Sequence, residues 1–249
     1  MNTIYILWLR QLKRYFRSKS RIIGSLGQPL LFLVALGFGL GPVFQQAGAG
    51  NYLQFLVPGV IAMSIIFTAL FSGVEVIWDK QFGFLKETLV APVSRLHIMI
   101  GRTLGGATVA VIQGLIVLTL ALLTGFRPVS LNLLPLAFVF MFLIALLFTA
   151  LGTAIASVLE DMQGFQLIMN FLVMPLFFLS GAIFPLQKGV PSLLLSVASL
   201  DPLSYGVDGL RDTLSGISHF GLHVDFLVLS LITALLLVIG SYVFSKIQI

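Results

Sequence analysis

The sequence has 249 residues, of which 58% are hydrophobic and 9% are charged, and its formal net charge is +5. A soluble globular domain carries roughly a quarter of charged residues, so this chain lacks the charged surface that such a domain needs. The composition therefore excludes a soluble enzyme, a disordered protein and a collagen-like chain, and it indicates an integral membrane protein. The absence of cysteine excludes disulfides, thiolate metal sites and a catalytic thiol.

Residues 1–21 form a basic N-terminal arm. The arm differs from a signal peptide, because its cations are interleaved with apolar residues that recur at helical spacing from Ile4 through Trp8 to Leu12. This pattern is typical of a helix that lies in the membrane interface, with its aromatic face in the headgroup boundary and its cations toward anionic lipid. The alternative is a basic flank that only orients the first span. The cations of the arm are Arg10, Lys13, Arg14, Arg17, Lys19 and Arg21.

Uncharged runs long enough to cross a bilayer follow the arm, since about 20 apolar residues suffice for a spanning helix. They predict an all-α membrane protein with a single transmembrane domain of six spans. Residues 190–200 are apolar but too short to span, and we expect them to form a re-entrant or interfacial helix. The predicted spans are residues 22–40, 54–77, 98–124, 133–158, 166–184 and 226–245.

The predicted segments divide the chain into successive parts. These are the arm at 1–21, spans one and two within 22–77, a cytoplasmic segment at 78–97, spans three to five within 98–184, an external region at 185–225, and span six with the C-terminus at 226–249.

The distribution of basic residues predicts the orientation. Six spans put both termini on one side, and most Lys and Arg residues lie in the arm, in residues 78–102 and at the C-terminus, whereas the other side carries Arg127, Lys188 and Arg211. The positive-inside bias then predicts a multi-pass protein of the inner or plasma membrane with both termini in the cytoplasm.

Nucleotide-binding and catalytic motifs are missing. No glycine-rich loop ends in Gly-Lys-Ser or Gly-Lys-Thr, so we expect a chain that is not an enzyme and binds no cofactor of its own. His219 and His223 on the external side make a weak metal site by themselves. Glu75 is the one ionisable candidate for an ion path within the predicted spans, and it lies near a cytoplasmic end. An ion-coupled secondary transporter or a channel is therefore the alternative function.

The segment between spans two and three has the pattern of a short amphipathic helix. Phe82, Leu85 and Leu89 share one side of this helix, and Pro92 should end it. A cytoplasmic helix that is tethered to two spans can transmit a partner's movement to both of them. The alternative is a solvated loop that only reverses the chain.

This segment resembles the cytoplasmic coupling segment of type 2 ABC exporter permeases, above all in Gly83-Phe84-Leu85-Lys86-Glu87 and in residues 89–95. The likeness is strongest to the branch with daunorubicin-resistance and nodulation-factor exporters. Many relatives carry a glutamate directly after the leucine, where this sequence has Lys86 followed by Glu87. Other parts agree in order: the basic N-terminal helix, Tyr52 to Gly59 opening span two, Phe178 to Pro185 closing span five, and Asp201 to Arg211.

The resemblance implies a permease subunit of an ATP-driven exporter that moves a hydrophobic or amphipathic substrate such as a drug, a lipid or a glycolipid. It implies a second permease chain, forming a homodimer, and two copies of a cytoplasmic ATPase subunit that holds ATP and Mg. Membrane lipid is a further expected partner, whereas no binding of nucleic acid is expected. The implied site residues are Gly83, Phe84, Leu85, Lys86, Glu87 and Pro92 for ATPase coupling, Phe67, Phe71, Phe171, Phe177 and Phe178 for the substrate path, Phe184, Pro185, Asp201, Pro202, Tyr205, Asp208 and Arg211 for the external gate, and Trp8, Arg10, Lys13, Arg14 and Arg17 for the interfacial helix.

Overall fold

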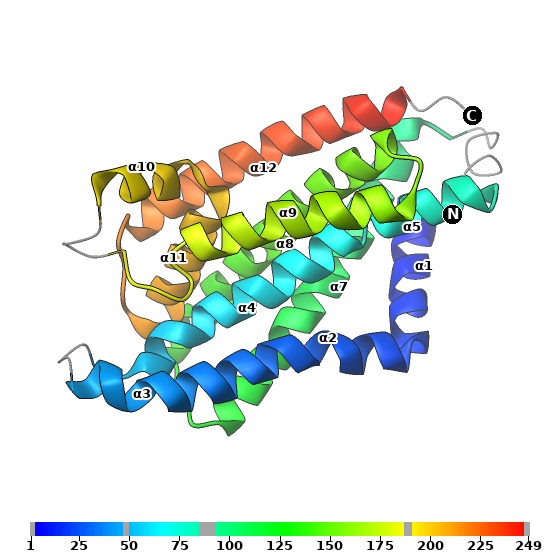
Figure 1. Ribbon diagram of the computed structural model, residues 1–249. Helices are drawn as coiled ribbons and strands as arrows, with labels where there is room; N and C mark the ends of the chain where they lie inside the picture. The colour runs from blue at the N-terminus through cyan, green and yellow to red at the C-terminus, as the bar shows by residue number, and fades with distance from the viewer. Residues whose placement is uncertain (1–2, 47–49, 85–92, 187–190, 247–249) are drawn as a thin grey trace.

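The computed structural model describes residues 3–46, 50–84, 93–186 and 191–246, and all regular structure in these ranges is helical (Figure 1). The prediction of an all-α protein with six spans is confirmed. Both chain termini lie at one end of the bundle, which we refer to as the terminal end (Figure 1). The helical stretches that are long and apolar enough to cross a membrane are Lys19–Gln46, Tyr52–Gln81, Arg95–Leu123, Leu131–Val158, Met162–Leu179 and Leu222–Ser245.

The N-terminal helix α1 (Thr3–Arg17) lies across the terminal end and meets the first span at a steep angle (Figure 1). The chain turns at Ser18, whose backbone leaves the helical region before α2 (Lys19–Leu31) begins. The first span continues through a π-helical stretch (Phe32–Leu36) into α3 (Gly37–Gln46). Pro29, just before this stretch, removes one backbone donor from the helix, which favours such local irregularity.

The second span forms the centre of the bundle. It consists of α4 (Tyr52–Phe71) and α5 (Val74–Gln81), and α4 packs against α7, α8 and α11. The side chain of Asn51 accepts a hydrogen bond from the N–H of Leu53 and so caps the start of α4. Where α4 passes into α5, Gly73 faces the backbone of Gly152 on α8, so the two helices approach as closely as their main chains allow.

The remaining spans are α7 (Arg95–Leu123), α8 (Leu134–Val158, after the short helix Leu131–Leu133), α9 (Met162–Leu179) and α12 (Leu222–Ser245). Span five begins and ends earlier than predicted, at Met162–Leu179 instead of residues 166–184. It ends at Leu179 instead of Phe184, because Ser180 caps the helix and Gly181 then adopts a left-handed conformation with φ of 72°.

Two helices form the region between spans five and six: α10 (Ser192–Leu200) and α11 (Pro202–Ser215). The predicted boundary at Asp201-Pro202 is confirmed. The carboxylate of Asp201 accepts a hydrogen bond of 2.8 Å from the N–H of Leu203, and Pro202 occupies the first helical position, where its missing N–H costs nothing. Helix α11 is largely buried against α4, α8 and α12, whereas α10 is mostly exposed.

The coupling segment begins differently from the prediction. Phe82 was expected on the same amphipathic helix as the residues after it, but it caps the end of α5. Gly83 then takes a left-handed conformation with φ of 76°, which ends α5 and separates Phe82 from Phe84. Residues 85–92 lie outside the described residues.

Two glycines on α7 let α1 rest directly on this helix. A Cβ atom at Gly101 would lie 3.0 Å from the carbonyl oxygen of Ile4, and one at Gly105 would lie 2.6 Å from the side chain of Gln11. Small residues at helix crossings permit such close approach. The position of α1 therefore depends on the absence of side chains at these two positions.

We predict that Gly105→Leu displaces α1 from α7 and lowers the free energy of unfolding by at least about 1–3 kcal/mol, the usual cost of overpacking. The matched control is Gly41→Leu, because a Cβ at Gly41 meets nothing within 4 Å. Thermal denaturation in detergent measures both variants. Equal midpoints for the two variants would contradict this packing.

Candidate functional site

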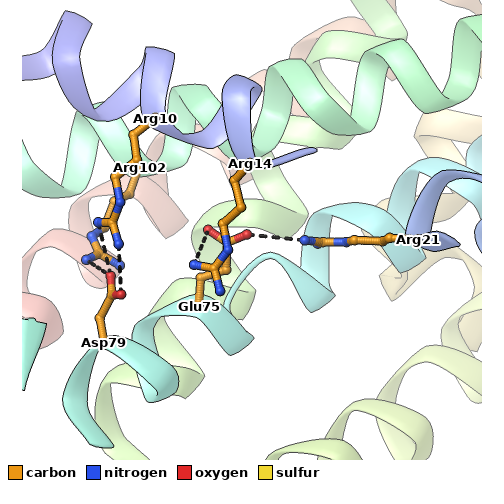
Figure 2. A network of polar contacts seen from close by, with 6 residues as sticks. All are labelled: Arg10, Arg14, Arg21, Glu75, Asp79 and Arg102. Atoms are coloured by element: carbon orange, nitrogen blue, oxygen red, sulfur yellow. Dashed lines mark hydrogen bonds and ion pairs between the residues drawn. The ribbon is translucent and has the colours of Figure 1, made fainter. Parts of the chain in front are cut away.

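Two acidic residues on α5, Glu75 and Asp79, lie one turn apart at the terminal end and point toward arginines from three other helices (Figure 2). Arg10 of α1 donates hydrogen bonds to Asp79 from both of its terminal nitrogens, with Nη2 3.0 Å from Oδ1 and Nη1 3.3 Å from Oδ2. Arg102 of α7 donates to Oδ2 of the same carboxylate. A bidentate arginine–carboxylate pair of this kind is strong, and its two parallel hydrogen bonds also fix the relative orientation of the side chains.

Glu75 joins two further arginines (Figure 2). Its Oε1 lies 3.2 Å from Nη1 of Arg21 on α2, and its Oε2 lies 3.7 Å from Nη1 of Arg14 on α1. The arginine network therefore connects α1, α2, α5 and α7. It consists of Arg10, Arg14, Arg21, Arg102, Glu75 and Asp79.

The charges of the network are largely removed from solvent. Glu75, Asp79 and Arg102 are only 4%, 5% and 3% exposed. Buried charges need close partners, because their desolvation is expensive. The network holds more guanidinium groups than carboxylates, so positive charge is in excess, and the three arginines of α1 and α2 keep about a third of their side chains exposed.

Aromatic rings extend the network to the start of the coupling segment. The guanidinium carbon of Arg10 lies 3.9 Å from the centre of the Phe84 ring, and that of Arg14 lies 4.9 Å from the centre of the Trp78 ring. Both are distances at which a cation is attracted to an aromatic face. Of the predicted coupling residues, Phe84 thus adjoins the network and Gly83 directly precedes it. Leu85, Lys86, Glu87 and Pro92 lie outside the described residues.

Polar aromatic residues hold α1 against α7. The indole N–H of Trp8 donates to the hydroxyl of Thr108 over 3.0 Å, and the hydroxyl of Tyr15 donates to the amide oxygen of Gln113 over 2.7 Å. Burial raises the pKa of Tyr15, against a lowering effect of Arg21, so this hydroxyl stays a neutral donor. The expectation of an aromatic face in the headgroup boundary is therefore wrong for Trp8 and Tyr15.

The cations of α1 divide into two sets. Arg10 and Arg14 pair with carboxylates of α5, so the expectation that they face anionic lipid is wrong. Lys13 and Arg17 are exposed, and for them that expectation stays a prediction. Lipid headgroups compete poorly for the first two arginines because α5 already supplies desolvated carboxylates at close range.

Lys80 forms a second anchor for α5. Its Nζ donates to three carbonyl oxygens at the end of α8, those of Ala156, Ser157 and Leu159, over 3.2, 2.6 and 3.1 Å. A cation at a helix C-terminus satisfies carbonyls that have no partner within the helix. The end of α5 is thereby held to α8 as well as to α1 and α7.

The phenylalanines predicted for the substrate path do not gather at one place. Phe67 and Phe71 on α4 stack with nearly parallel rings 6.3 Å apart and line one cavity. Phe177 is buried against Phe32, whereas Phe171 and Phe178 on α9 are exposed. Of these five residues, Phe67 and Phe71 line a shared cavity.

The residues predicted for the external gate also separate into groups. Pro185, Asp208 and Arg211 line one cavity at the end of the bundle opposite the terminal end. Tyr205 donates to the carbonyl oxygen of Ser199 over 2.8 Å. Asp201 and Pro202 form the cap of α11, and Phe184 is exposed.

Asp208 and Arg211 lie three residues apart on α11 and form no ion pair with each other. Asp208 accepts hydrogen bonds from the N–H groups of His219 and Phe220 over 2.8 and 2.7 Å. Arg211 lies 4.0 Å from the centre of the Phe55 ring. Burial lowers the pKa of Arg211 to about 10, with Asp208 opposing, so the side chain remains charged at neutral pH. Its guanidinium donates to the carbonyl oxygens of Phe55, Gly181 and Ala182.

Within the described residues, no group of three or more His, Cys, Asp or Glu side chains could hold a metal ion. His219 and His223 accordingly belong to no such group. His219 instead takes part in the hydrogen bonds that hold the turn between α11 and α12 to Asp208.

Comparison with known proteins identifies the family. The model of the ABC-2 type transporter family matches residues 2–215. The chain belongs to this family. It is 29% identical to the transport permease ycf38 of Cyanophora paradoxa over 84% of this chain and 72% of that protein, and 26% identical to nodulation protein J of Rhizobium leguminosarum bv. viciae over 86% and 83%. It is also 25% identical to the inner membrane transport permease YadH of Escherichia coli over 90% and 87%.

The expected resemblance is thus confirmed. The ABC-2 chain is a multi-pass membrane permease of an ABC transporter and a non-enzymatic transmembrane subunit. Permeases of this family normally work with an ATPase subunit. The arginine network lies where the second span of this permease meets the predicted coupling segment, which makes the network a candidate site of coupling.

We predict that Asp79→Ala destabilises the permease by about 3–5 kcal/mol, because it leaves the buried charge of Arg102 without its partner. The double variant Asp79→Leu with Arg102→Met should recover most of this loss. The control is Lys13→Ala, which removes an exposed cation of the same helix as Arg10. Thermal denaturation in detergent is the measurement, and an Asp79→Ala midpoint equal to the control would contradict the network's role.

A second prediction concerns Asp201. Burial raises the pKa of its carboxyl to about 7, against the lowering effect of the Leu203 N–H. Because the folded-state pKa lies above the unfolded value, this carboxyl stabilises the fold below about pH 4 and loses that contribution as the pH rises toward 7. Asp201→Asn keeps the cap and removes the titration. Relative to the parent, the variant should gain about 2–3 kcal/mol between pH 5 and pH 8.

The measurement is the thermal midpoint in detergent across this pH range. Parallel pH profiles for the parent and Asp201→Asn would show that Asp201 does not titrate as inferred.

Proposed function

We propose that this permease exports a hydrophobic or amphipathic substrate as a homodimer driven by two copies of a cytoplasmic ATPase subunit, which holds ATP and Mg. Both termini and the coupling segment then lie in the cytoplasm, as the positive-inside bias favours. The observation that carries the proposal is the arginine network, because it joins the start of the coupling segment to three spans and to α1.

The coupling step follows from this connection. Closure of the ATPase subunits on ATP would push the segment that begins at Gly83 and Phe84. Phe84 lies against Arg10, and Arg10 holds Asp79, so a displacement of the segment reaches α5 and α1 together. Helix α5 continues the second span, and the push therefore arrives at α4 in the centre of the bundle. The coupling between nucleotide and substrate sites is the free energy carried by this displacement.

At the other end of the bundle, Arg211 is placed to respond to the movement of α4. It connects three elements through carbonyl oxygens: the first turn of α4 at Phe55, the turn after α9 at Gly181 and Ala182, and its own helix α11. A shift of α4 relative to α9 would loosen these bonds. Opening of the external gate is then a consequence of a movement that begins at the coupling segment.

The alternative of an ion-coupled transporter has less support. A carboxylate on an ion path must be free to exchange its ion. Glu75 is 4% exposed and lies between Arg14 and Arg21, so it is already neutralised within the protein. This pairing favours a structural role in the network and a separate source of energy.

We predict that Phe84→Ala and Glu87→Ala each reduce substrate-stimulated ATP hydrolysis by about tenfold in the reconstituted complex, within the range of typical coupling energies. Phe84→Ala removes the ring against Arg10, and Glu87→Ala removes the acidic side chain expected to contact the ATPase. Leu235→Ala on the exposed face of α12 serves as the control.

The measurement is ATPase activity and export in liposomes that contain the permease with its copurified ATPase subunit. Export that continues without the ATPase subunit would contradict the proposal and support the ion-coupled alternative. Unchanged stimulation in both variants would contradict the coupling assignment.

A further inference from the structure

A cavity of about 280 Å³ lies between α2 and α4, beneath the end of α1. Because the two helices run in opposite directions, Arg21 and Phe71 lie toward the terminal end of the cavity, and Pro29 and Met63 lie toward the middle of the bundle. Its volume is close to the lower limit of about 300 Å³ for ligand pockets. It therefore has room for a headgroup and the first part of an apolar chain.

The terminal end of the cavity is positively charged. Arg21 lines the cavity and is about one third exposed. Its only ion-pair partner among the described residues is Glu75, which also pairs with Arg14. Asp79 is likewise shared by two arginines, so the neighbouring part of the network supplies no further negative charge for Arg21. A guanidinium with donors to spare binds carboxylate and phosphate groups in its fork geometry.

Uncommitted polar groups lie along the cavity wall. Within the described residues, the side chains of Gln28 and Thr68 line the cavity and make no hydrogen bond. In contrast, the hydroxyls of Ser25 and Ser64 donate to carbonyl oxygens of their own helices. A free amide at membrane depth is costly unless a ligand or water satisfies it. The first two side chains therefore mark positions for polar atoms of a bound molecule.

The remaining wall is apolar. The stacked rings of Phe67 and Phe71 present aromatic surface from α4, and Met63 adds a flexible side chain that adapts to different shapes. The cavity thus combines a cationic end, uncommitted polar groups and an aromatic wall. Groups of these three kinds are the ones that an amphiphile with a negatively charged head would contact.

We propose that this cavity binds an anionic amphiphile, with its carboxylate or phosphate at Arg21 and its apolar part along Phe67 and Phe71. The inference rests on the proposed function, because it names the class of substrate that the exporter takes up. Tyr15 lines the cavity but donates its hydroxyl proton to Gln113, so Arg21 supplies the donors for the anionic head. A longer chain would leave the cavity between α2 and α4 toward the lipid.

The test measures binding to the purified permease in phosphatidylcholine nanodiscs without any ATPase, so failure of the coupling proposal does not affect it. The probe is radiolabelled dodecyl phosphate, and the competitors are unlabelled dodecyl phosphate, dodecanoate, dodecyl maltoside and inorganic phosphate. We expect both anionic amphiphiles to displace the probe at least about tenfold better than the other two, as charge-assisted hydrogen bonds and apolar burial act together.

Two variants locate the site. Arg21→Gln should weaken probe binding by about tenfold or more, while Lys13→Gln, which removes an exposed cation of α1 outside the cavity, should leave it unchanged. Gly24→Leu should abolish binding by filling the cavity, because Gly24 lines it and a Cβ there meets nothing within 4 Å. Its control is Gly27→Leu, a position on the same helix that is equally open but lies outside the cavity lining.

Loss of binding in Gly24→Leu would not result from a destabilised helix, since leucine favours a helix more than glycine does. Equal competition by dodecyl maltoside would contradict the requirement for an anionic headgroup. Equal competition by inorganic phosphate would contradict the requirement for an apolar chain. Binding that survives Gly24→Leu, or that falls as much in Lys13→Gln as in Arg21→Gln, would place the probe on the charged surface and not in this cavity.

Discussion

The structure depends on the neutralisation of charges that are buried at one end of an apolar bundle. Arg102 lies inside the third span with almost no exposed surface, and the carboxylate of Asp79 on α5 neutralises its buried charge. An isolated charge in such surroundings costs several kcal/mol, so the two helices are held in one register. Arg10 on α1 also donates hydrogen bonds to the carboxylate of Asp79. The terminal end is thus built around one shared group, and Glu75 repeats the arrangement one turn away.

This constraint explains why the coupling segment can act on the spans. Helices in a bilayer are held together by close packing and by polar contacts, because the hydrophobic effect does not drive them together there. Forked ion pairs and the three carbonyls held by Lys80 provide such polar contacts at the end of α5. A push on the residues after Gly83 is therefore passed on to α4. The cavity beside Phe67 and Phe71 lies within two turns of that connection.

The spans could be predicted because apolar length alone determines them, and the errors occurred where backbone conformation decides. Gly181 ends span five early, and Gly83 separates Phe82 from the segment after it, both through positive φ. The arginine network could not be predicted, since its members come from distant parts of the chain. The available signal was the pair Glu75 and Asp79, one turn apart at the end of an apolar run, together with an arginine inside span three. Arg211 was expected at the external gate, but its partners are carbonyl oxygens from distant parts of the chain, which sequence spacing does not indicate.

The most direct test is the distance between α5 and α1 in the working complex, measured by double electron–electron resonance. The chain has no cysteine, so spin labels can be placed at Lys13, Phe82 and Tyr242 without removing any thiol. If the arginine network moves α5 and α1 together, ATP changes the Phe82–Tyr242 distance while the Phe82–Lys13 distance stays the same. A changed Phe82–Lys13 distance, or no change in either pair, would contradict this coupled movement.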